Sequence, residues 1–238
     1  MINEQTEKAP RHLVIIPDGN RRWAKEKNLK PWKGHEAGAE NTEKLIFFAL
    51  RRGVECLTFW GSSVDNLTKR PLQEKKALLD IYKKYFEKLL QGEDIHRHEA
   101  RVNIIGRWEE QFPESLKKIL YELIEKTKHY QKKVLNFMLA YNGDDEMLMA
   151  ISKIHEKYEK GVQITAEILK ANLMTAQLPR VDYLIRTGGD PHLSAGFMMW
   201  DMANAQLYFA EEKYPDFDEE KLGRALDEYA SRQRRFGK

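Results

Sequence analysis

One short stretch near the start of the chain combines residue types that bind metal ions and phosphate groups. Residues 13–16 are apolar and predict a buried strand, and the sequence Asp-Gly-Asn at 18–20 ends it before a charged, helix-compatible segment. Free N–H groups at a helix start attract anions, and a carboxylate such as that of Asp18 suits Mg²⁺. Arg21 and Arg22 add donors that match phosphate oxygens. The stretch favours a magnesium-assisted diphosphate site; the alternative is an ordinary turn with solvated side chains.

Four further groups of polar residues and glycines stand near predicted strand ends or helix starts. They are residues 34–38 with His35 between two glycines, 61–71 with hydroxyl, amide and guanidinium groups, 186–194 with paired glycines, and 232–237 with three arginines. The second group suits a mobile anion-binding loop, and the glycines of the third let backbone N–H groups approach an anion. Each group alone could be structural or solvated, but together they favour a site for one or two diphosphates.

Other kinds of site find little support in the sequence. There is no Gly-x-x-x-x-Gly-Lys motif of a nucleoside triphosphatase and no Cys/His spacing that fits zinc. A Ser–His–Asp hydrolase is the main chemical rival, but the chain has no Gly-x-Ser-x-Gly elbow.

The composition is that of a globular protein from a reducing compartment. The length of 238 residues suits one large domain or two small ones, and a net charge of +3 does not favour a nucleic-acid partner. The single cysteine, Cys56, excludes an internal disulfide framework and fits the cytosol. We expect no signal peptide and no membrane span, because no apolar run approaches the roughly 18 residues that a spanning helix needs.

Short apolar runs alternate with helix-length segments along the whole chain. The predicted strands are residues 13–16, 56–60, 102–105, 134–139, 183–185 and 207–209, and the predicted helices are 37–52, 72–91, 113–130, 144–160, 165–176 and 219–234. This alternation predicts an α/β fold with a mostly parallel six-stranded sheet flanked by helices. No linker divides the chain, so we predict a flexible segment 1–11 followed by a single domain, 12–238.

The segment 72–90 carries a broad apolar stripe at helical spacing. Its members are Leu78, Leu79, Ile81, Tyr82, Tyr85, Phe86, Leu89 and Leu90. Such a stripe normally faces a core, but it could also form one wall of an apolar groove or tunnel. The sequence leaves both readings open because both require the same stripe.

The motifs, in their order along the chain, resemble those of the cis-prenyltransferases, whose best-known bacterial member is undecaprenyl diphosphate synthase. The matching motifs are Asp18-Gly19-Asn20-Arg21-Arg22-Trp23-Ala24, Gly34-His35-Glu36-Ala37-Gly38, Ser63…Asp65-Asn66…Arg70-Pro71…Glu74, Ala140-Tyr141-Asn142 with Asp145-Glu146, Arg186-Thr187-Gly188-Gly189, Leu207-Tyr208-Phe209, Tyr214-Pro215-Asp216-Phe217 and Arg234-Arg235-Phe236-Gly237. So many ordered motifs rarely arise by chance.

The resemblance implies an enzyme that adds isopentenyl diphosphate, in cis, to an allylic diphosphate such as farnesyl diphosphate. It also implies Mg²⁺ as cofactor, a homodimer, an apolar product tunnel and a polyprenyl diphosphate product that is a lipid carrier precursor. We therefore expect no nucleic-acid partner and a cytoplasmic protein with transient, peripheral membrane contact, because a long apolar product must leave into lipid.

The resemblance assigns roles to residues by their positions in the motifs. Asp18 would be the essential catalytic acid and a Mg²⁺ ligand together with Gln206, and Asn66 would act near the reacting carbons beside Ser63. The allylic diphosphate would be held by Gly19, Asn20, Arg21, Arg22 and His35, and the isopentenyl diphosphate by Arg70, Arg186, Ser194, Arg235 and Gly237, the last two often across the dimer. The other expected substrate contacts are Trp23, Val64, Asp65, Leu67, Glu74 and His192.

Several positions depart from the family pattern. Gln206 replaces the usual Glu and should weaken Mg²⁺ binding, while His192 replaces an Arg and removes a permanent charge from the isopentenyl site. Leu67 replaces an aromatic residue, Pro31 stands where many members have Arg, and two loops look one residue longer. These departures keep two alternatives open: a divergent prenyltransferase with short or irregular products, and a non-catalytic partner subunit of an active homologue.

Overall fold

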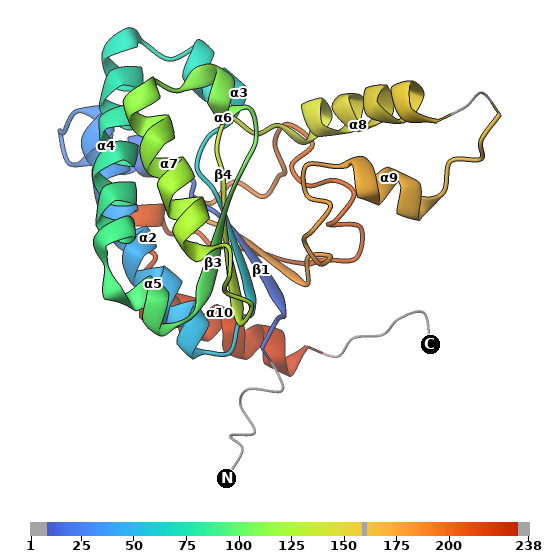
Figure 1. Ribbon diagram of the computed structural model, residues 1–238. Coiled ribbons are helices and arrows are strands. Elements are labelled where there is room, and N and C mark those ends of the chain that lie inside the picture. The colour runs from blue at the N-terminus through green and yellow to red at the C-terminus, as the bar shows by residue number, and fades with distance from the viewer. Residues whose placement is uncertain (1–8, 159–160, 233–238) are drawn as a thin grey trace.

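A twisted sheet of six strands lies at the centre of the protein (Figure 1). The computed structural model describes residues 9–158 and 161–232. The strands are β1 (His12–Ile16), β2 (Cys56–Trp60), β3 (Ala100–Ile105), β4 (Lys133–Met138), β5 (Tyr183–Arg186) and β6 (Gln206–Phe209). Their order is β3-β4-β2-β1-β5-β6 and every neighbouring pair is parallel, so the predicted α/β fold is confirmed.

Helices connect the strands, as parallel pairing requires. They are α1 (Asn20–Glu26), α2 (Pro31–Arg51), α3 (Val64–Thr68), α4 (Leu72–Gln91), α5 (Glu93–Arg97), α6 (Trp108–Gln111), α7 (Glu114–Thr127), α8 (Gly143–Lys157), α9 (Ala166–Asn172), the 3₁₀ turn η1 (Tyr214–Asp216) and α10 (Glu219–Ser231). Helices α2, α4 and α7 stand together beside the sheet, whereas α8 and α9 project from it as an arm (Figure 1).

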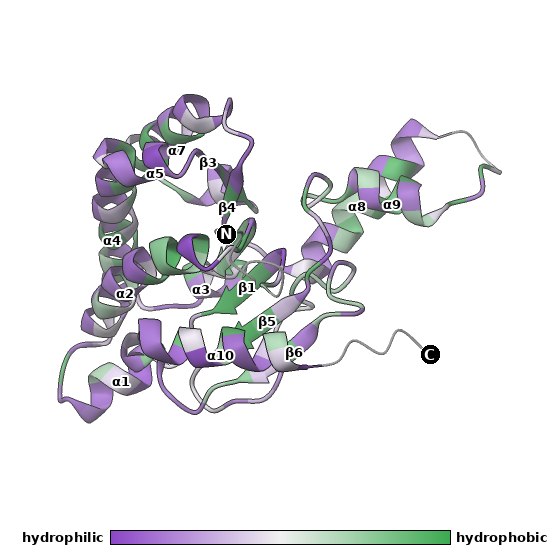
Figure 2. Ribbon diagram, turned by 90° about the horizontal axis from the view of Figure 1, so that it is seen from below, coloured by the Kyte–Doolittle hydropathy of each residue, from purple (hydrophilic) through white to green (hydrophobic). Residues whose placement is uncertain are grey.

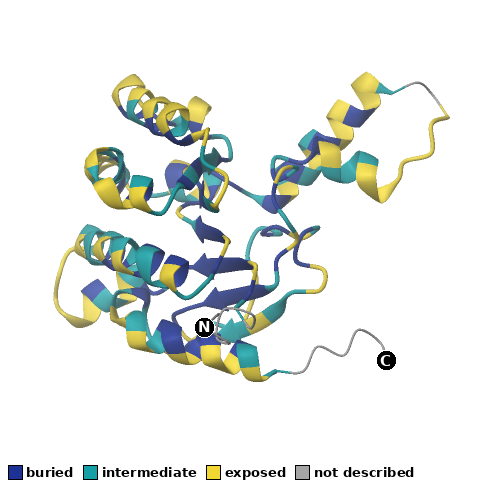
Figure 3. Ribbon diagram, turned by 60° about the horizontal axis from the view of Figure 1, so that its bottom comes forward, coloured by how far each residue is buried: buried dark blue, intermediate teal, exposed yellow. Residues whose placement is uncertain are grey.

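Alternate residues of β1 enter two separate apolar cores. Leu13 and Ile15 pack with residues of α2, α4 and α7, while Val14 and Ile16 pack on the other face of the sheet. That second face is covered largely by an irregular segment that includes Phe197, Met198 and Met202 rather than by a long helix. The central strands are buried on both faces, as parallel sheets usually are (Figure 3).

Two element boundaries differ from the prediction in ways that matter for the site. Helix α2 begins at Pro31, six residues before the predicted start, because proline suits the first turn of a helix; His35 therefore lies inside the helix. The predicted mobile loop at 61–71 is wrong for residues 64–68, which form α3. Most of the predicted flexible segment 1–11 and the last residues of the predicted helix 219–234 lie outside the described residues.

None of the helices in the described ranges is long and apolar enough to cross a membrane.

Candidate functional site

The end of β1 and the end of β5 bring an acidic and a basic side chain together. Ile16 pairs with Arg186 in the parallel register, so Asp18, two residues further along, lies beside the Arg186 side chain. Arg186 Nη2 donates a hydrogen bond of 2.8 Å to Asp18 Oδ2. The Arg186 side chain is only 5% exposed, so this charge is fixed inside the protein at the carboxyl edge of the sheet.

The turn that follows β1 fixes the Asp18 carboxylate from its other side. Gly19 donates its N–H to Asp18 Oδ1 at 2.5 Å, and Arg22 Nη2 lies 3.3 Å from the same oxygen. Gly19 has φ +98°, and a Cβ at this position would lie 2.9 Å from Lys213 Cβ, so both the backbone and the space require glycine. The carboxylate remains about one-third exposed, which leaves it open to a ligand.

A loop after β5 is arranged around the second half of the Arg186 guanidinium. Arg186 Nη1 donates to the carbonyl oxygen of His192 at 2.6 Å and to Ser194 Oγ at 3.2 Å. His192 Nδ1 lies 2.8 Å from Asp190 Oδ1, and this bond lowers the pKa of Asp190. The structure thus brings Arg186, His192 and Ser194 into one group next to Asp18.

A second charged group surrounds the carboxylate of Glu74 in the first turn of α4. This carboxylate is almost fully buried, and its Oε1 lies 3.4 Å from Arg21 Nε, 3.4 Å from His35 Nε2 and 3.6 Å from Arg70 Nε. Glu74 therefore joins α1, α2 and the segment between α3 and α4. A sequence motif placed Glu74 among the site residues, but only the fold shows that it organises three basic side chains.

His35 is held neutral within this group. Burial, and then the charge of Arg70, lower its pKa from 6.5 to about 4, against the opposing effect of Glu74. Arg70 Nη1 lies 3.1 Å from His35 Nε2. Because a guanidinium can only donate, His35 Nε2 is an acceptor in this contact.

The lowered pKa predicts how stability depends on pH. Between pH 6.5 and about pH 4, His35 is protonated in the unfolded chain but stays neutral in the folded one. The free energy of unfolding is therefore highest above pH 6.5 and falls as pH decreases through this range. We expect His35→Gln to lose about 2 kcal/mol less unfolding free energy than the wild type between pH 7 and pH 4.5. Urea unfolding across this range measures it, with the exposed His155→Gln as control. If the free energy of unfolding changed equally with pH in the wild type and in both variants, the lowered pKa of His35 would be contradicted.

Ser63 and Asn66 fix the start of α3. Ser63 Oγ accepts a hydrogen bond from Asn66 N at 3.1 Å, and Asn66 Oδ1 accepts one from Ser63 N at 3.4 Å. This reciprocal capping explains why the segment is helical where the sequence suggested a loop. The Asn66 amide is a poor base, so these contacts favour a positioning role for it.

Gln206 is not brought to Asp18 within the chain. It begins β6 and pairs with Tyr183 at the start of β5, so it lies at the amino edge of the sheet while Asp18 lies past the carboxyl edge. Arg232 Nη1 lies 3.4 Å from Gln206 Oε1. Across residues 9–158 and 161–232, no group of three or more His, Cys, Asp or Glu side chains could hold a metal ion.

The remaining predicted residues have mixed placements. Trp23 Nε1 donates to Asp216 at 2.8 Å, Asp65 pairs with Lys69 at 2.7 Å, and Leu67 is fully buried. Val64 packs on the main core. Asn20 donates to Pro17 O, and its own buried Oδ1 has no partner in the described part of the chain. Arg235 and Gly237 lie outside the described residues.

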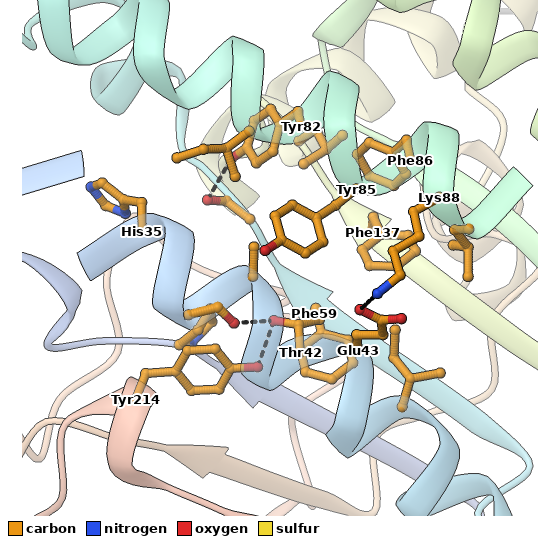
Figure 4. A pocket seen from close by; sticks show the side chains of 18 of the residues that line it. His35, Thr42, Glu43, Phe59, Tyr82, Tyr85, Phe86, Lys88, Phe137 and Tyr214 are labelled. Carbon is orange, nitrogen blue, oxygen red and sulfur yellow. Dashed lines mark hydrogen bonds and ion pairs between the residues drawn. The ribbon is translucent and has the colours of Figure 1, made fainter. Parts of the chain in front are cut away.

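An apolar cavity of about 270 Å³ starts beside these charged groups and runs between α2, α4 and the sheet (Figure 4). Asn20 and His35 line one end, and the ion pair of Glu43 with Lys88, at 2.7 Å, lies at the other. The α4 stripe supplies much of the wall: Leu78, Ile81, Tyr82, Tyr85, Phe86 and Leu89. The stripe thus serves both readings, because Leu78 and Phe86 also belong to the main core. That a product occupies this cavity stays a prediction.

The cavity also contains hydroxyl groups whose hydrogen-bond partners the sequence did not reveal. Thr42 and Tyr214 share a hydrogen bond of 2.7 Å between their hydroxyl groups, although 172 positions separate them. Tyr82 donates to Gly61 O at 2.8 Å, and burial raises the pKa of Tyr82 to about 12. Each buried hydroxyl is thus satisfied, which leaves the cavity surface predominantly apolar.

Comparisons with known proteins agree with this geometry. The family model described as "Putative undecaprenyl diphosphate synthase" matches residues 16–237. An isoprenyl transferase of Thermus thermophilus is 36% identical over 96% of this chain and 89% of its own length. A tritrans,polycis-undecaprenyl-diphosphate synthase (geranylgeranyl-diphosphate specific) of Methanocaldococcus jannaschii is also 36% identical, over 96% of this chain and 83% of its own.

A solved structure is similar over nearly the whole fold. The lavandulyl diphosphate synthase of Lavandula x intermedia, in complex with dimethylallyl diphosphate, superimposes with a TM-score of 0.90 at 30% identity. The match covers 98% of this chain and 100% of that structure.

Proposed function

Because the chain belongs to the undecaprenyl diphosphate synthase family and is a prenyl transferase enzyme, we propose that it extends an allylic diphosphate with isopentenyl diphosphate to make a Z-polyprenyl diphosphate. The observation that carries this proposal is the junction of two environments. The charged groups around Asp18 and Glu74 lie beside one end of the apolar cavity, and Asn20 and His35 line the cavity at that end. A molecule with a diphosphate head and a hydrocarbon tail matches that junction.

The charged residues divide into two groups that suit two diphosphates. Arg21, Arg22 and the start of α1 would hold the allylic diphosphate, with its tail in the cavity. Arg186, Ser194 and His192 would hold the isopentenyl diphosphate. Since Asp18 contacts Arg22 and Arg186, it lies between the two groups.

This placement accounts for the bond changes of the reaction. The allylic C–O bond breaks and the diphosphate leaves with the electron pair, so fixed guanidinium groups stabilise charge where it develops. The terminal double bond of isopentenyl diphosphate forms the new C–C bond, and a proton leaves the adjacent carbon. Asn66 would position the reactants for this step, and a substrate phosphate oxygen or water would take the proton.

The carboxylate of Asp18 suits a magnesium ion that is bound together with a substrate. Mg²⁺ is commonly held by one or two carboxylates together with substrate phosphates, and Asp18 stands beside the phosphate-binding arginines. When bound, the ion would neutralise charge on the leaving diphosphate. Asp18 would hold it, whereas Gln206 of the same chain stands at the other edge of the sheet.

The histidine at 192 predicts weak binding of isopentenyl diphosphate. We expect His192→Arg to lower KM for this substrate about fivefold, because a permanent guanidinium gains a charge-assisted hydrogen bond to the diphosphate. Steady-state kinetics at pH 7.5 measures the change. His129→Arg, at an exposed position after α7, adds the same charge elsewhere and should leave KM unchanged. An unchanged KM in His192→Arg would place His192 outside the substrate contact.

We propose a homodimer assembled through the arm. Three large apolar side chains on α8 and beyond it are exposed in the single chain: Leu148 at 65%, Ile151 at 56% and Met199 at 43%. Leu148 and Ile151 are three positions apart on α8 and so share one face of it, and an exposed apolar face marks an interface more often than free solvent. We also place the enzyme in the cytoplasm with transient membrane contact, because its product is a lipid.

The likeness to a lavandulyl diphosphate synthase supports a second candidate, an irregular coupling of short prenyl diphosphates. Labelled isopentenyl diphosphate with farnesyl, geranylgeranyl or dimethylallyl diphosphate separates the candidates, using Mg²⁺ or EDTA and chromatographic sizing of the product. The proposed function predicts an elongated product that needs Mg²⁺ and isopentenyl diphosphate. A short branched product from dimethylallyl diphosphate alone would favour the second candidate.

A further inference from the structure

The segment from α1 to the start of α2 concentrates the positive charge of the protein. Residues 20–33 contain six basic residues and one acidic residue, a net charge of +5, whereas the whole chain carries +3. The other residues together are therefore net negative, at −2. A charge so unevenly placed indicates a surface that meets an anionic partner.

Three lysines of this segment are exposed and have no anionic partner. Lys25, Lys27 and Lys30 lie within six positions of one another, and none has a carboxylate within 4.0 Å among the described residues. The one acidic residue of the segment, Glu26, is neutralised by Lys213 at 2.9 Å. The positive field of the lysines is thus left unbalanced at the surface.

The turn that carries these lysines is ordered and presents an apolar side chain. Asn28 has φ +55°, and Leu29 N donates to Ala24 O at 2.8 Å, which closes the end of α1. Leu29 is 45% exposed at this turn. A leucine set between lysines is suited to entering the interface of a bilayer while the lysines meet its headgroups.

The side chain of Trp23 connects the turn to the body of the protein. Trp23 Nε1 donates to Asp216 of η1 at 2.8 Å, and Lys27 Nζ lies 4.7 Å from the centre of the Trp23 ring. The turn therefore does not need to fold before it binds. In Figure 2, α1 occupies an outer corner of the molecule and is mainly hydrophilic.

This corner adjoins the entrance of the candidate site. Arg21, on the same short helix, contacts Glu74 at the start of α4, and Leu72 stands two positions before Glu74 with 82% exposure. Asn20, the first residue of α1, lines the charged end of the cavity, so a partner bound at the corner would lie close to that end. Among anionic partners, a bilayer fits better than a nucleic acid because the exposed Leu29 stands beside the lysines and no exposed aromatic ring is available for base stacking among residues 20–33, all of which the structure describes.

We propose that Lys25, Lys27, Leu29 and Lys30 form a docking surface for an anionic lipid bilayer. The surface binds headgroups through the lysines and inserts Leu29, which holds the site entrance against the membrane. The biological role of this surface, the transfer of an apolar product into lipid, rests on the proposed function. The binding of anionic vesicles itself does not depend on that function.

Vesicle flotation of the full chain tests the proposal. Vesicles of phosphatidylcholine with 30% phosphatidylglycerol, a composition of about one anionic lipid in three, are compared with phosphatidylcholine alone. We expect binding to the anionic vesicles only, and the variant Lys25→Gln/Lys27→Gln/Lys30→Gln to bind roughly a hundredfold more weakly. Leu29→Ser, which keeps every charge, should bind about tenfold more weakly.

A matched control removes three exposed lysines elsewhere that have no carboxylate within 4.0 Å in the described part of the chain. Lys118→Gln/Lys153→Gln/Lys157→Gln loses the same net charge from α7 and α8 and should bind like the wild type. Equal weakening in both triple variants would overturn the docking surface, as would equal binding to both vesicle types or no effect of Leu29→Ser. Tighter binding to an RNA oligonucleotide than to anionic vesicles at the same ionic strength would also overturn it.

Activity measured without vesicles separates this proposal from the proposed function. The Lys25/Lys27/Lys30 variant should keep the wild-type rate with soluble substrates, because none of these lysines pairs with the carboxylates of Asp18 or Glu74, and the one contact with an expected site residue is that of Lys27 with the outer ring of Trp23. Vesicle binding without any prenyl product would refute the proposed function and leave the docking surface standing. An active enzyme that does not bind anionic vesicles would refute the docking surface and leave the proposed function standing.

Discussion

Asp18→Asn should lower kcat about a thousandfold while the protein remains folded. The substitution keeps the shape of the side chain but removes the charge that Arg22 and Arg186 contact and that a magnesium ion would need. Asparagine still offers one oxygen, so the effect reports the charge rather than the packing. The rate of isopentenyl incorporation at saturating substrates and Mg²⁺ measures it.

A neighbouring carboxylate provides the control for this prediction. Asp190 lies 3.8 Å from the same Arg186 guanidinium but on the loop that follows β5. Asp190→Asn should lower kcat by no more than about tenfold, since it removes a charge without removing the proposed metal ligand. Melting temperatures verify that both variants fold, and Asp18→Glu tests position with the charge retained. A rate above one-tenth of wild type in Asp18→Asn would exclude the assigned role.

The second large effect concerns the length of the product. Ala39 and Ile46 both line the cavity from α2, and they are seven positions apart, about 10 Å along the helix axis. Ala39→Leu would narrow the cavity closer to the charged end than Ile46→Phe would. We expect both variants to stop at shorter products, with Ala39→Leu shorter than Ile46→Phe by about two isoprene units.

The control lies on the same wall but faces solvent. Lys83 is an exposed residue of α4, and Lys83→Leu should leave product length unchanged. Chromatography of dephosphorylated products gives the length distribution of each variant. If Ala39→Leu and Ile46→Phe gave the wild-type distribution at a reduced rate, the growing chain would not occupy this cavity.

The sequence predicted the sheet well because strand signals are local. In β1 every residue is apolar or buried, and such runs, separated by helical segments, leave few alternatives to a parallel sheet. Strand order and register, which place Asp18 beside Arg186, depend on contacts across 168 positions and were not available from local patterns. The family motifs brought both residues into the site without giving their contact.

The differences arise from a local helix start that the sequence analysis did not recognise and from contacts between distant segments. The predicted loop at 64–68 is helical because Ser63 and Asn66 satisfy each other's backbone N–H groups, and Asn142 accepts from the N–H of Val64 at 3.1 Å. The role of Glu74 depends on basic residues from α1, α2 and the segment between α3 and α4. Gln206 was grouped with Asp18 by motif alone, and only the sheet register shows that they stand at opposite edges.

The configuration of the newly formed double bonds tests the central claim most directly. Purified protein would be incubated with farnesyl diphosphate, ¹³C-labelled isopentenyl diphosphate and Mg²⁺, and the product examined by NMR. The account predicts a diphosphate of an extended chain whose new double bonds are Z and whose formation stops in Asp18→Asn. New bonds in the E configuration, or a product that forms equally well in Asp18→Asn, would contradict it.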